Sequence, residues 1–244
     1  MRDFNVFGII PARYASSRFP GKPLALINGK PMLQCVYERV LKAEINSVAV
    51  ATDDERIADC VRSFGGKVVM TSPNHASGTD RCGEAVLAMQ PADNDVVINI
   101  QGDEPLISPR EIHLLVSAFE DRTVQIATLV NPFQDEELFR NPNVVKVVKA
   151  KNGNVLYFSR LPIPYLRENA ALPKTYYRHI GIYAYRYKVL RDIVQLPPSE
   201  LENSEKLEQL RWLENGYNIR ALECDYQGIG VDTPEDLEKL AVNS

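Results

Sequence analysis

The sequence contains few residues of the kinds that form metal clusters, disulfide frameworks or membrane spans. Its four cysteines are scattered over 244 residues without a CxxC pair, and it has only three histidines. These features exclude a zinc-cluster signature, and no Ser-His-Asp or Cys-His catalytic set follows from the spacing. No apolar run reaches transmembrane length, and we find no signal-peptide pattern. We therefore expect a cytoplasmic protein without disulfides.

Charge is distributed unevenly along the chain. The 28 lysines and arginines are outweighed by 32 aspartates and glutamates, which gives a formal net charge of −4. This balance argues against a nucleic-acid or membrane-surface role, and we expect neither kind of partner. Residues 4–37, however, contain no acidic side chain and include Arg13, Arg18, Lys22 and Lys30. A local positive patch on an acidic protein predicts a small anionic ligand.

Strand and helix patterns alternate through the first half of the chain. Short runs rich in Val and Ile predict strands at residues 4–10, 47–51, 67–70 and 95–100. Helices are expected at residues 32–43, 54–64, 78–89 and 108–119. Such strands are buried on both faces, so we predict an α/β fold with a mostly parallel open sheet and helices on both faces. Ligands bind such sheets outside the carboxyl ends of the strands, here the loops 11–23, 52–54, 71–81 and 101–105.

The second half of the chain is less regular. Asn152-Gly153 lies between two β-rich segments and predicts a hairpin. Another strand is expected at residues 179–186, and helices at 204–215 and 233–242. We find no repeat and no low-complexity linker. We therefore expect one domain over residues 1–244, in which a small β-hairpin region serves dimerisation.

The basic loop at residues 11–23 lacks the glycine patterns of the common phosphate-binding motifs. It has no GxGxxG, and Gly21-Lys22 is followed by Pro23, where a Walker loop requires Ser or Thr. Its three cations, two serine hydroxyls and backbone donors still offer a way to hold a polyphosphate. The alternative is a solvated basic loop stiffened by its prolines. We favour the phosphate site because the cations cluster where α/β folds bind ligands.

Two aspartates are candidate magnesium ligands. Asp103 follows the apolar run "VVINI" in the motif "NIQGDEP", and Mg²⁺ binds one or two carboxylates together with phosphate oxygens and water. A turn-forming role for Asp103 is the alternative. In "GVDTPED", Thr233, Pro234 and Asp236 read as a helix start, which leaves Asp232 without a capping role. For Asp232, a metal-binding and a structural role are equally open.

Three further features are ambiguous on their residues alone. "SGTDR", residues 77–81, is typical of a helix N-terminus that recognises a base or an anion, or of simple capping by Ser77 or Thr79. In the predicted helix 204–215, Glu205, Glu208, Gln209 and Trp212 lie largely opposite a leucine stripe; a solvated face is favoured over a polyol-binding face. His179 opens a strand, where a site role and a buried hydrogen-bonded role are both open.

Taken together, the motifs resemble those of the 3-deoxy-manno-octulosonate cytidylyltransferase (CMP-Kdo synthetase) family. The resemblance runs in family order over nearly the whole chain, through "IIPARYASSRFPGKPL", "VATDD", "SGTDR", "NIQGDEP", "NPNVVKVV", "LYFSR", "RHIGIYAYR", "LEQLR" and "GVDTPEDL". It implies a cytosolic nucleotidyltransferase that makes CMP-Kdo and pyrophosphate from CTP and 3-deoxy-D-manno-octulosonate (Kdo), for lipopolysaccharide synthesis. It also implies a fold like that of other sugar nucleotidyltransferases, a homodimer, a nucleotide-binding half at about 1–120 and a sugar-binding and dimerisation half at about 121–244.

The same resemblance implies roles for individual residues. The CTP phosphates would be held by Arg13, Arg18 and Lys22. Cytosine and ribose would be held by the backbone around Pro11 and Ala12 and by the segment Ser77, Gly78 and Arg81. The Mg²⁺ cofactor would be bound by Asp103 and Asp232, which with Lys22 and Arg13 form the implied catalytic set. The sugar-acid pocket would be lined by Gln101, Arg160, His179, Tyr183, Glu208 and Gln209, with Arg160 facing the Kdo carboxylate.

Two rival functions are considered. One is a nucleotidyltransferase for a sugar 1-phosphate or another acidic sugar; sugar-phosphate enzymes usually open with a glycine-rich loop, where this chain has Ala12, Ser16 and Ser17. The other is a non-catalytic nucleotide-binding regulator, which would not need Asp103 and Asp232 together with Lys22. The sequence does not distinguish Kdo from its 8-amino analogue.

Overall fold

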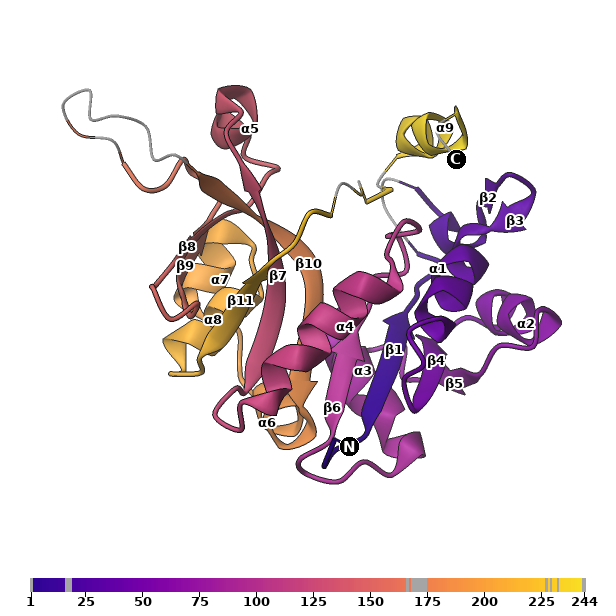
Figure 1. Cartoon of the computed structure of the whole chain (residues 1–244). Coiled ribbons are helices and arrows are strands. Elements are labelled where there is room, and N and C mark those ends of the chain that lie inside the picture. Colours follow the sequence, from indigo (N-terminus) through magenta and orange to yellow (C-terminus); the bar gives the residue numbers. More distant parts are fainter. Residues whose placement is uncertain are drawn as a thin grey trace.

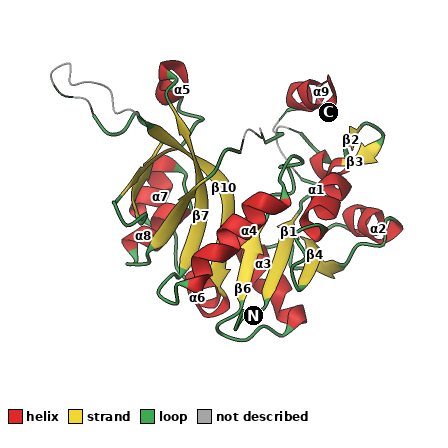
Figure 2. Cartoon of the chain, viewed as in Figure 1, coloured by secondary structure: helices red, strands yellow, loops and turns green. Residues whose placement is uncertain are grey.

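The computed structural model describes residues 2–15, 19–165, 167, 175–226, 228, 230, 231 and 233–242. Within this part of the chain, a nine-stranded sheet has helices on both faces (Figures 1 and 2). The strand order is β11-β7-β10-β6-β1-β4-β5, with β8 and β9 attached to β10. The predicted α/β fold with an open, mostly parallel sheet is confirmed.

The first half of the chain forms the parallel part of the sheet. Its strands are β1 (Val6–Pro11), β4 (Ser47–Thr52), β5 (Val68–Met70) and β6 (Val96–Asn99). Its helices are α1 (Met32–Leu41), α2 (Glu55–Ser63), α3 (Gly78–Ala85) and α4 (Pro109–Ser117), with 3₁₀ turns at Lys22–Leu24, Val86–Met89 and Ala118–Glu120. All the elements predicted for this half are therefore present, with ends shifted by a few residues.

Alternation along β1 divides the core into two layers. Val6 and Ile10 pack in one cluster with residues of α1, α2 and α4. Phe7 and Ile9 point to the opposite face and pack with residues of α3 and of α6 (Tyr187–Ile193). A strand with apolar side chains on both faces is stable where helices cover both of its faces. The run Val6–Ile10 therefore occupies the middle of the sheet.

The second half of the chain adds an antiparallel centre. The long strand β10 (Tyr176–Arg186) runs antiparallel to β6 on one side and to β7 (Ile126–Phe133) on the other. The edge strand β11 (Ile219–Glu223) pairs parallel with β7. The strands β7 and β11 are not foreseen from the sequence.

The predicted hairpin around Asn152-Gly153 is confirmed. It joins β8 (Lys146–Lys149) and β9 (Val155–Ser159) in antiparallel pairing. Gly153 has a φ of +85°, and the Asn152 Oδ1 accepts a hydrogen bond from the Asn154 amide at 3.0 Å. These are the residue types that such a turn requires.

The single helix predicted over 204–215 is wrong. Two short helices, α7 (Glu200–Glu205) and α8 (Gln209–Glu214), are separated at Lys206, which is left-handed with a φ of +53°. A capping box at Ser199 starts α7 early, and Glu202 then pairs with Arg211 of α8 at 2.6 Å. The favoured solvated face is also wrong.

The burial of two residues shows why that face is not solvated. Gln209 is 6% exposed and Trp212 is 1% exposed. The Trp212 ring meets Tyr183 and Tyr185 edge-on, at centroid distances of 5.0 and 5.5 Å. The aromatic contacts come from β10, far away in the sequence, so the helical pattern alone gives no sign of them.

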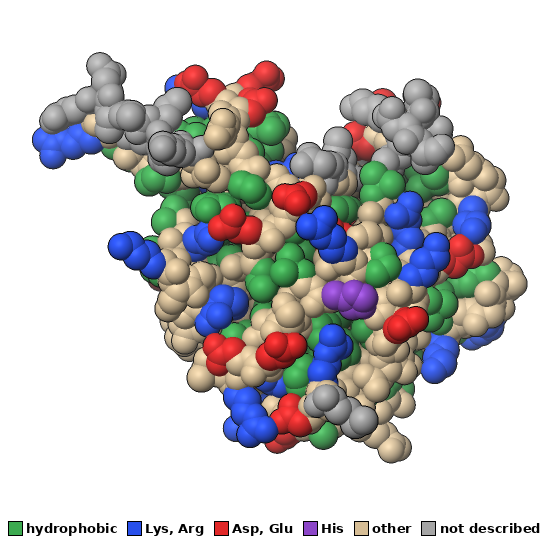
Figure 3. Space-filling view, in the orientation of Figure 1, with side chains coloured by type: hydrophobic (Ala, Val, Ile, Leu, Met, Phe, Trp, Pro, Cys, Tyr) green, Lys and Arg blue, Asp and Glu red, His purple; other side chains and the backbone are tan. Residues whose placement is uncertain are grey.

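The remaining elements lie at the periphery. They are β2 (Leu26–Ile27), β3 (Lys30–Pro31), α5 (Glu136–Arg140) and α9 (Pro234–Val242), which lies near β2 and β3 (Figure 1). The start of α9 is the predicted capping box, since Thr233 and Asp236 exchange hydrogen bonds at 3.1 and 3.4 Å. Acidic and basic side chains are interspersed over the face shown in Figure 3. Among the described helices, none combines the length and the apolar character needed to cross a membrane.

Candidate active site

A cavity of about 420 Å³ opens at the carboxyl ends of β1 and β6. It is lined by Pro11, Ala12, Arg13, Ala15, Lys22, Pro23, Met32, Gly78, Gln101, Gly102 and Asp103. The loops that follow two neighbouring parallel strands, together with the start of α3, therefore converge as the sequence predicts. Of the residues predicted for nucleotide and metal binding, Arg18 and Asp232 lie outside the described residues.

Lys22 and Asp103 form an ion pair in this cavity. The Lys22 Nζ lies 2.5 Å from the Asp103 Oδ2, and the two side chains are 15% and 31% exposed. Lys22 starts a 3₁₀ turn after Gly21, whose φ is +70° and whose amide donates to the Tyr14 carbonyl at 2.9 Å. The basic loop is thus folded back over the cavity, where an ammonium group and a carboxylate can meet a polyphosphate and its metal ion.

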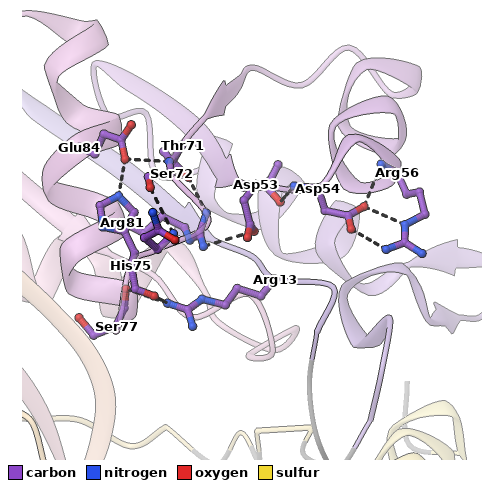
Figure 4. A network of polar contacts seen from close by, with 12 residues as sticks. Arg13, Asp53, Asp54, Arg56, Thr71, Ser72, His75, Ser77, Arg81 and Glu84 are labelled. Carbon is purple, nitrogen blue, oxygen red and sulfur yellow. Dashed lines mark hydrogen bonds and ion pairs between the residues drawn. The ribbon is translucent and has the colours of Figure 1, made fainter.

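Arg13 connects the basic loop to the start of α3. Its guanidinium donates to the His75 carbonyl and, at 3.4 Å, to the Ser77 carbonyl (Figure 4). Ser77 caps α3 in a capping box with Asp80. At Gly78, a Cβ would lie 3.3 Å from the Pro11 Cγ, so a side chain here would crowd the loop after β1. The capping role of Ser77 is confirmed, and the helix N-terminus still opens onto the cavity.

Arg81 is buried and is not among the residues that line the cavity. It is 1% exposed, its Nη1 donates to the Thr71 Oγ1 at 2.5 Å, and its Nη2 lies 3.2 Å from the Asp53 Oδ1 (Figure 4). Burial lowers the pKa of this guanidinium. The side chain therefore ties the loops after β4 and β5 together beneath the site, and direct contact between Arg81 and CTP stays a prediction.

The predicted sugar-pocket residues of β10 are brought together by an irregularity in the strand. His179 and Tyr183 would be about 13 Å apart in a regular strand. The register against β7 shifts between Ile180 and Tyr183, and the two rings lie 5.2 Å apart. Thr128 on β7 supports this shift, because its hydroxyl bonds to the His179 Nε2 at 3.0 Å and donates to the Ile182 carbonyl at 2.8 Å.

Tyr183 is buried, whereas His179 is half-buried. Burial lowers the pKa of His179 to about 3, so its imidazole is neutral at physiological pH. The hydroxyl of Tyr183 is buried and has no hydrogen-bond partner among the described residues. An orphaned buried hydroxyl is costly unless a ligand or a water satisfies it, which fits a pocket for a hydroxylated molecule.

The other predicted sugar-pocket residues come from three different segments. The Glu208 Oε2 accepts a hydrogen bond from the Thr79 Oγ1 at 2.8 Å, and burial raises the pKa of this carboxyl. The Arg160 Nε donates to the Glu205 carbonyl at 2.7 Å and its Nη1 to the Pro142 carbonyl at 3.1 Å. The guanidinium of Arg160 is therefore held at the junction between α7 and α8. Gln101 lines the cavity described above.

Three supporting contacts are missed by the sequence reasoning, which considers Thr79 only as a helix cap and does not consider Thr128 or Lys146. Thr128 and Thr79 are described above. Lys146 is fully buried, and its Nζ donates to the carbonyls of Asn141 at 2.8 Å, Val144 at 2.6 Å and Arg160 at 2.6 Å. A lysine in the middle of the apolar run "VVKVV" is the one signal that could have drawn attention to it.

Asp232, the second predicted metal ligand, directly follows a described residue that contacts Asp103. Val231, the residue before Asp232, is buried, and its amide donates to the Asp103 carbonyl at 2.9 Å. Among the described residues, no group of three or more His, Cys, Asp or Glu side chains could hold a metal ion. A site made of one or two carboxylates and substrate phosphates does not require such a group.

Comparison with known proteins identifies the class and then the family. A family model described as Cytidylyltransferase matches residues 7–220. A putative glucose-1-phosphate thymidylyltransferase from Bacillus anthracis shares the fold, with a TM-score of 0.65 at 20% identity over 98% of this chain and 94% of that one. The fold, the cavity and the family model thus define a cytidylyltransferase.

Relatives of high identity narrow the assignment. The chain is 57% identical over 240 residues to the 3-deoxy-manno-octulosonate cytidylyltransferase of Parabacteroides distasonis, covering 95% of both chains. It is 50% identical over 248 residues to that of Cytophaga hutchinsonii, covering 99% of this chain and 98% of the other. A solved CMP:2-keto-3-deoxy-manno-octonic acid synthetase complexed with CTP has a TM-score of 0.92 at 48% identity, over 98% of each chain. The chain belongs to the 3-deoxy-manno-octulosonate cytidylyltransferase family.

The lowered pKa of His179 predicts a specific loss of stability in acid. Its folded-state value of about 3 lies below the ordinary 6.5, so the unfolded chain takes up the proton first. The free energy of unfolding therefore falls as the pH drops from the ordinary value toward the folded value. Between about pH 8 and about pH 5, we expect His179 to account for a loss of up to about 2 kcal/mol.

Urea unfolding of the wild type and of His179→Gln at both pH values measures this effect. The variant should lack this part of the pH dependence, whatever its absolute stability. If both proteins lose the same free energy between the two pH values, the imidazole is not held neutral by burial.

Proposed function

We propose that this protein transfers CMP from CTP to the anomeric hydroxyl of Kdo, giving CMP-Kdo and pyrophosphate for lipopolysaccharide biosynthesis. The observation that carries the proposal is the cavity at the ends of β1 and β6, where Lys22, Arg13 and Asp103 meet the start of α3. The names of the relatives, and the CTP complex of the solved structure at 48% identity, support CTP and Kdo as the substrates. Since CTP is a cytoplasmic nucleotide, the proposed location is the cytoplasm.

In the proposed reaction, a bond forms between the anomeric oxygen and the α-phosphorus of CTP. The bond from that phosphorus to the bridging oxygen breaks, pyrophosphate leaves with the electron pair, and the hydroxyl proton passes to solvent. Such a transfer depends on positioning and on neutralising charge, not on a protein nucleophile. The Lys22 ammonium and the guanidinium groups of Arg13 and Arg18 are proposed to hold the phosphates and to stabilise the departing pyrophosphate.

We propose that Asp103 and Asp232 hold Mg²⁺. The Asp103 carboxylate is partly exposed in the cavity, and carboxylate, phosphate and water oxygens are the donors that this ion prefers. When bound, Mg²⁺ would supply positive charge beside the α-phosphate and orient the reacting groups. The Lys22 ammonium, now 2.5 Å from Asp103, would then turn from the carboxylate to the phosphates.

We propose that the sugar acid binds along β10 and the start of α8. The neutral imidazole of His179 and the unpartnered hydroxyl of Tyr183 can meet sugar hydroxyls, and the carboxylate of Glu208 can accept from them. Gln101 and Gln209 offer amide groups as further partners for sugar hydroxyls. We propose that the Arg160 guanidinium binds the Kdo carboxylate. This contact would replace the long contact of 3.5 Å that the guanidinium makes with the Lys206 carbonyl.

Pyrophosphate release tests the proposed reaction. With CTP and Kdo together we expect rapid release. CTP alone, CTP with sialic acid and CTP with a sugar 1-phosphate should give little, because these mixtures lack the acceptor that the site is built to hold. Release with the sugar 1-phosphate would favour the rival transferase, and no release with any acceptor would favour a regulator.

The metal assignment predicts a large effect at Asp103. We expect Asp103→Asn to lower kcat by about 100-fold or more and to raise the Mg²⁺ concentration needed for half-maximal rate, because one anionic ligand is lost. Asp93→Asn is the matched control, since Asp93 is 60% exposed and pairs with Arg191. Near-normal turnover of Asp103→Asn at ordinary Mg²⁺ concentrations would refute the assignment.

We also propose that the protein is a homodimer through the β8–β9 hairpin region. Three large apolar side chains are exposed there, Leu156 at 61%, Leu161 at 68% and Tyr165 at 87%. Light scattering should give twice the 27.5 kDa chain mass. Leu161→Asp should shift the mass toward the monomer, whereas Leu87→Asp, at a side chain that is 56% exposed elsewhere, should not. A monomeric wild type would contradict the proposal.

A further inference from the structure

A side-chain hydrogen bond connects the nucleotide side of the site to the sugar side. The Thr79 Oγ1 donates to the Glu208 Oε2 at 2.8 Å across 129 positions of sequence. Thr79 is the second residue of α3, directly after Gly78, which lines the cavity. Glu208 immediately precedes α8. The two residues come from different halves of the chain; Thr79 is buried and Glu208 is half-buried.

Helix capping does not account for the Thr79 hydroxyl. Ser77 already caps α3, because its Oγ accepts from the Asp80 amide at 3.1 Å and its own amide donates to the Asp80 Oδ2 at 3.0 Å. Thr79 is 3% exposed, so its hydroxyl cannot be satisfied by bulk water. The hydroxyl donates a hydrogen bond to the carboxylate of Glu208 instead. A buried carboxylate without such a donor would be strongly disfavoured.

Among the groups around Glu208, Thr79 contributes an important part of the stabilisation of the ionised carboxyl. On α3, Ser77 also favours the ionised carboxyl, whereas the charge of Asp80 opposes it. On α8, Arg211 favours it from a distance, but its guanidinium is engaged by Glu202 at 2.6 and 2.7 Å. The buried groups Tyr183 and Tyr185 on β10, and Cys82 on α3, are un-ionised neighbours, because burial raises the pKa of each.

We infer that Thr79 is a positioning residue that holds the Glu208 carboxylate, ionised and correctly oriented, toward the hydroxyl groups of the sugar acid. The inference rests on the proposed function for the identity of that substrate. Thr79 follows Gly78 in α3, so the position of the Glu208 carboxylate depends on how the start of this helix is placed.

The first test separates the sugar side from the nucleotide side. Thr79→Val keeps the shape of the side chain and removes the donor. We expect it to raise the KM for Kdo by about tenfold while the KM for CTP changes by less than about twofold, because a hydrogen bond to a charged group is lost on one side only. Thr79→Ser, which keeps the hydroxyl, should restore most of the affinity for Kdo.

The second test uses pH and a double-mutant cycle. A donor stabilises the ionised form of a carboxyl, so removing it raises the pKa. The acid limb of kcat/KM for Kdo should therefore move to higher pH in Thr79→Val. In a Glu208→Gln background, adding Thr79→Val should change the KM for Kdo by less than about twofold. Thr123→Val is the matched control, since the Thr123 hydroxyl donates to the Asp121 carboxylate at 2.7 Å on the surface.

The third test needs no substrate. A ¹³C NMR titration of the Glu208 carboxyl in the unliganded protein should give a higher pKa in Thr79→Val than in the wild type. An unchanged titration, or equal losses in the wild-type and Glu208→Gln backgrounds, would overturn the inference and leave Thr79 as a packing residue. Lack of turnover by the wild type with CTP and Kdo would instead overturn the proposed function, and the titration would still decide the role of Thr79.

Discussion

The antiparallel pairing of β10 between β6 and β7 is the constraint on which the site depends. Along one edge of β10, Tyr183 pairs with Asn99 of β6. Asn99 lies two residues before Gln101 and four before Asp103 in the sequence. The other edge meets Thr128, which holds the shifted register and the His179 ring. A strand that is bonded along both edges cannot slide without breaking both ladders. The residues proposed for the sugar acid are therefore placed relative to the phosphate-binding loop by main-chain hydrogen bonds.

The charged groups at the cavity and those beneath it differ in how easily they can change partners. At the cavity, Lys22 and Asp103 are partly exposed and face each other, so either can exchange its partner for a phosphate or a metal ion at little cost. Beneath it, Arg81 is fully enclosed, with Thr71 and Asp53 as its partners. A buried charge of this kind is expensive to disturb, and it fixes the loops after β4 and β5 beneath the site.

The sequence is most informative where structure depends on neighbouring residues. The buried strand β1, the capping boxes at Ser77 and Thr233 and the turn at Asn152-Gly153 follow from local patterns, and so does the gathering of Lys22, Gly78 and Asp103 at one sheet edge. The break at Lys206 is different, because it is accompanied by an ion pair between Glu202 of one helix and Arg211 of the next. The inward direction of Arg81 and the irregularity in β10 likewise depend on partners that no local pattern identifies. Periodicity describes one element at a time, whereas these features arise where two elements meet.

Lys146 has a consequence for the hairpin. Its ammonium group is surrounded by three carbonyl oxygens, as a potassium ion would be, and no described carboxylate is hydrogen-bonded to it. Because this cation is covalently attached to β8, it cannot be removed by dialysis or displaced by another ion. The segment after β9 is thus fastened to the start of β8 by an internal counterpart of a structural metal. Any force that displaces the hairpin would therefore also act on the main chain of Arg160.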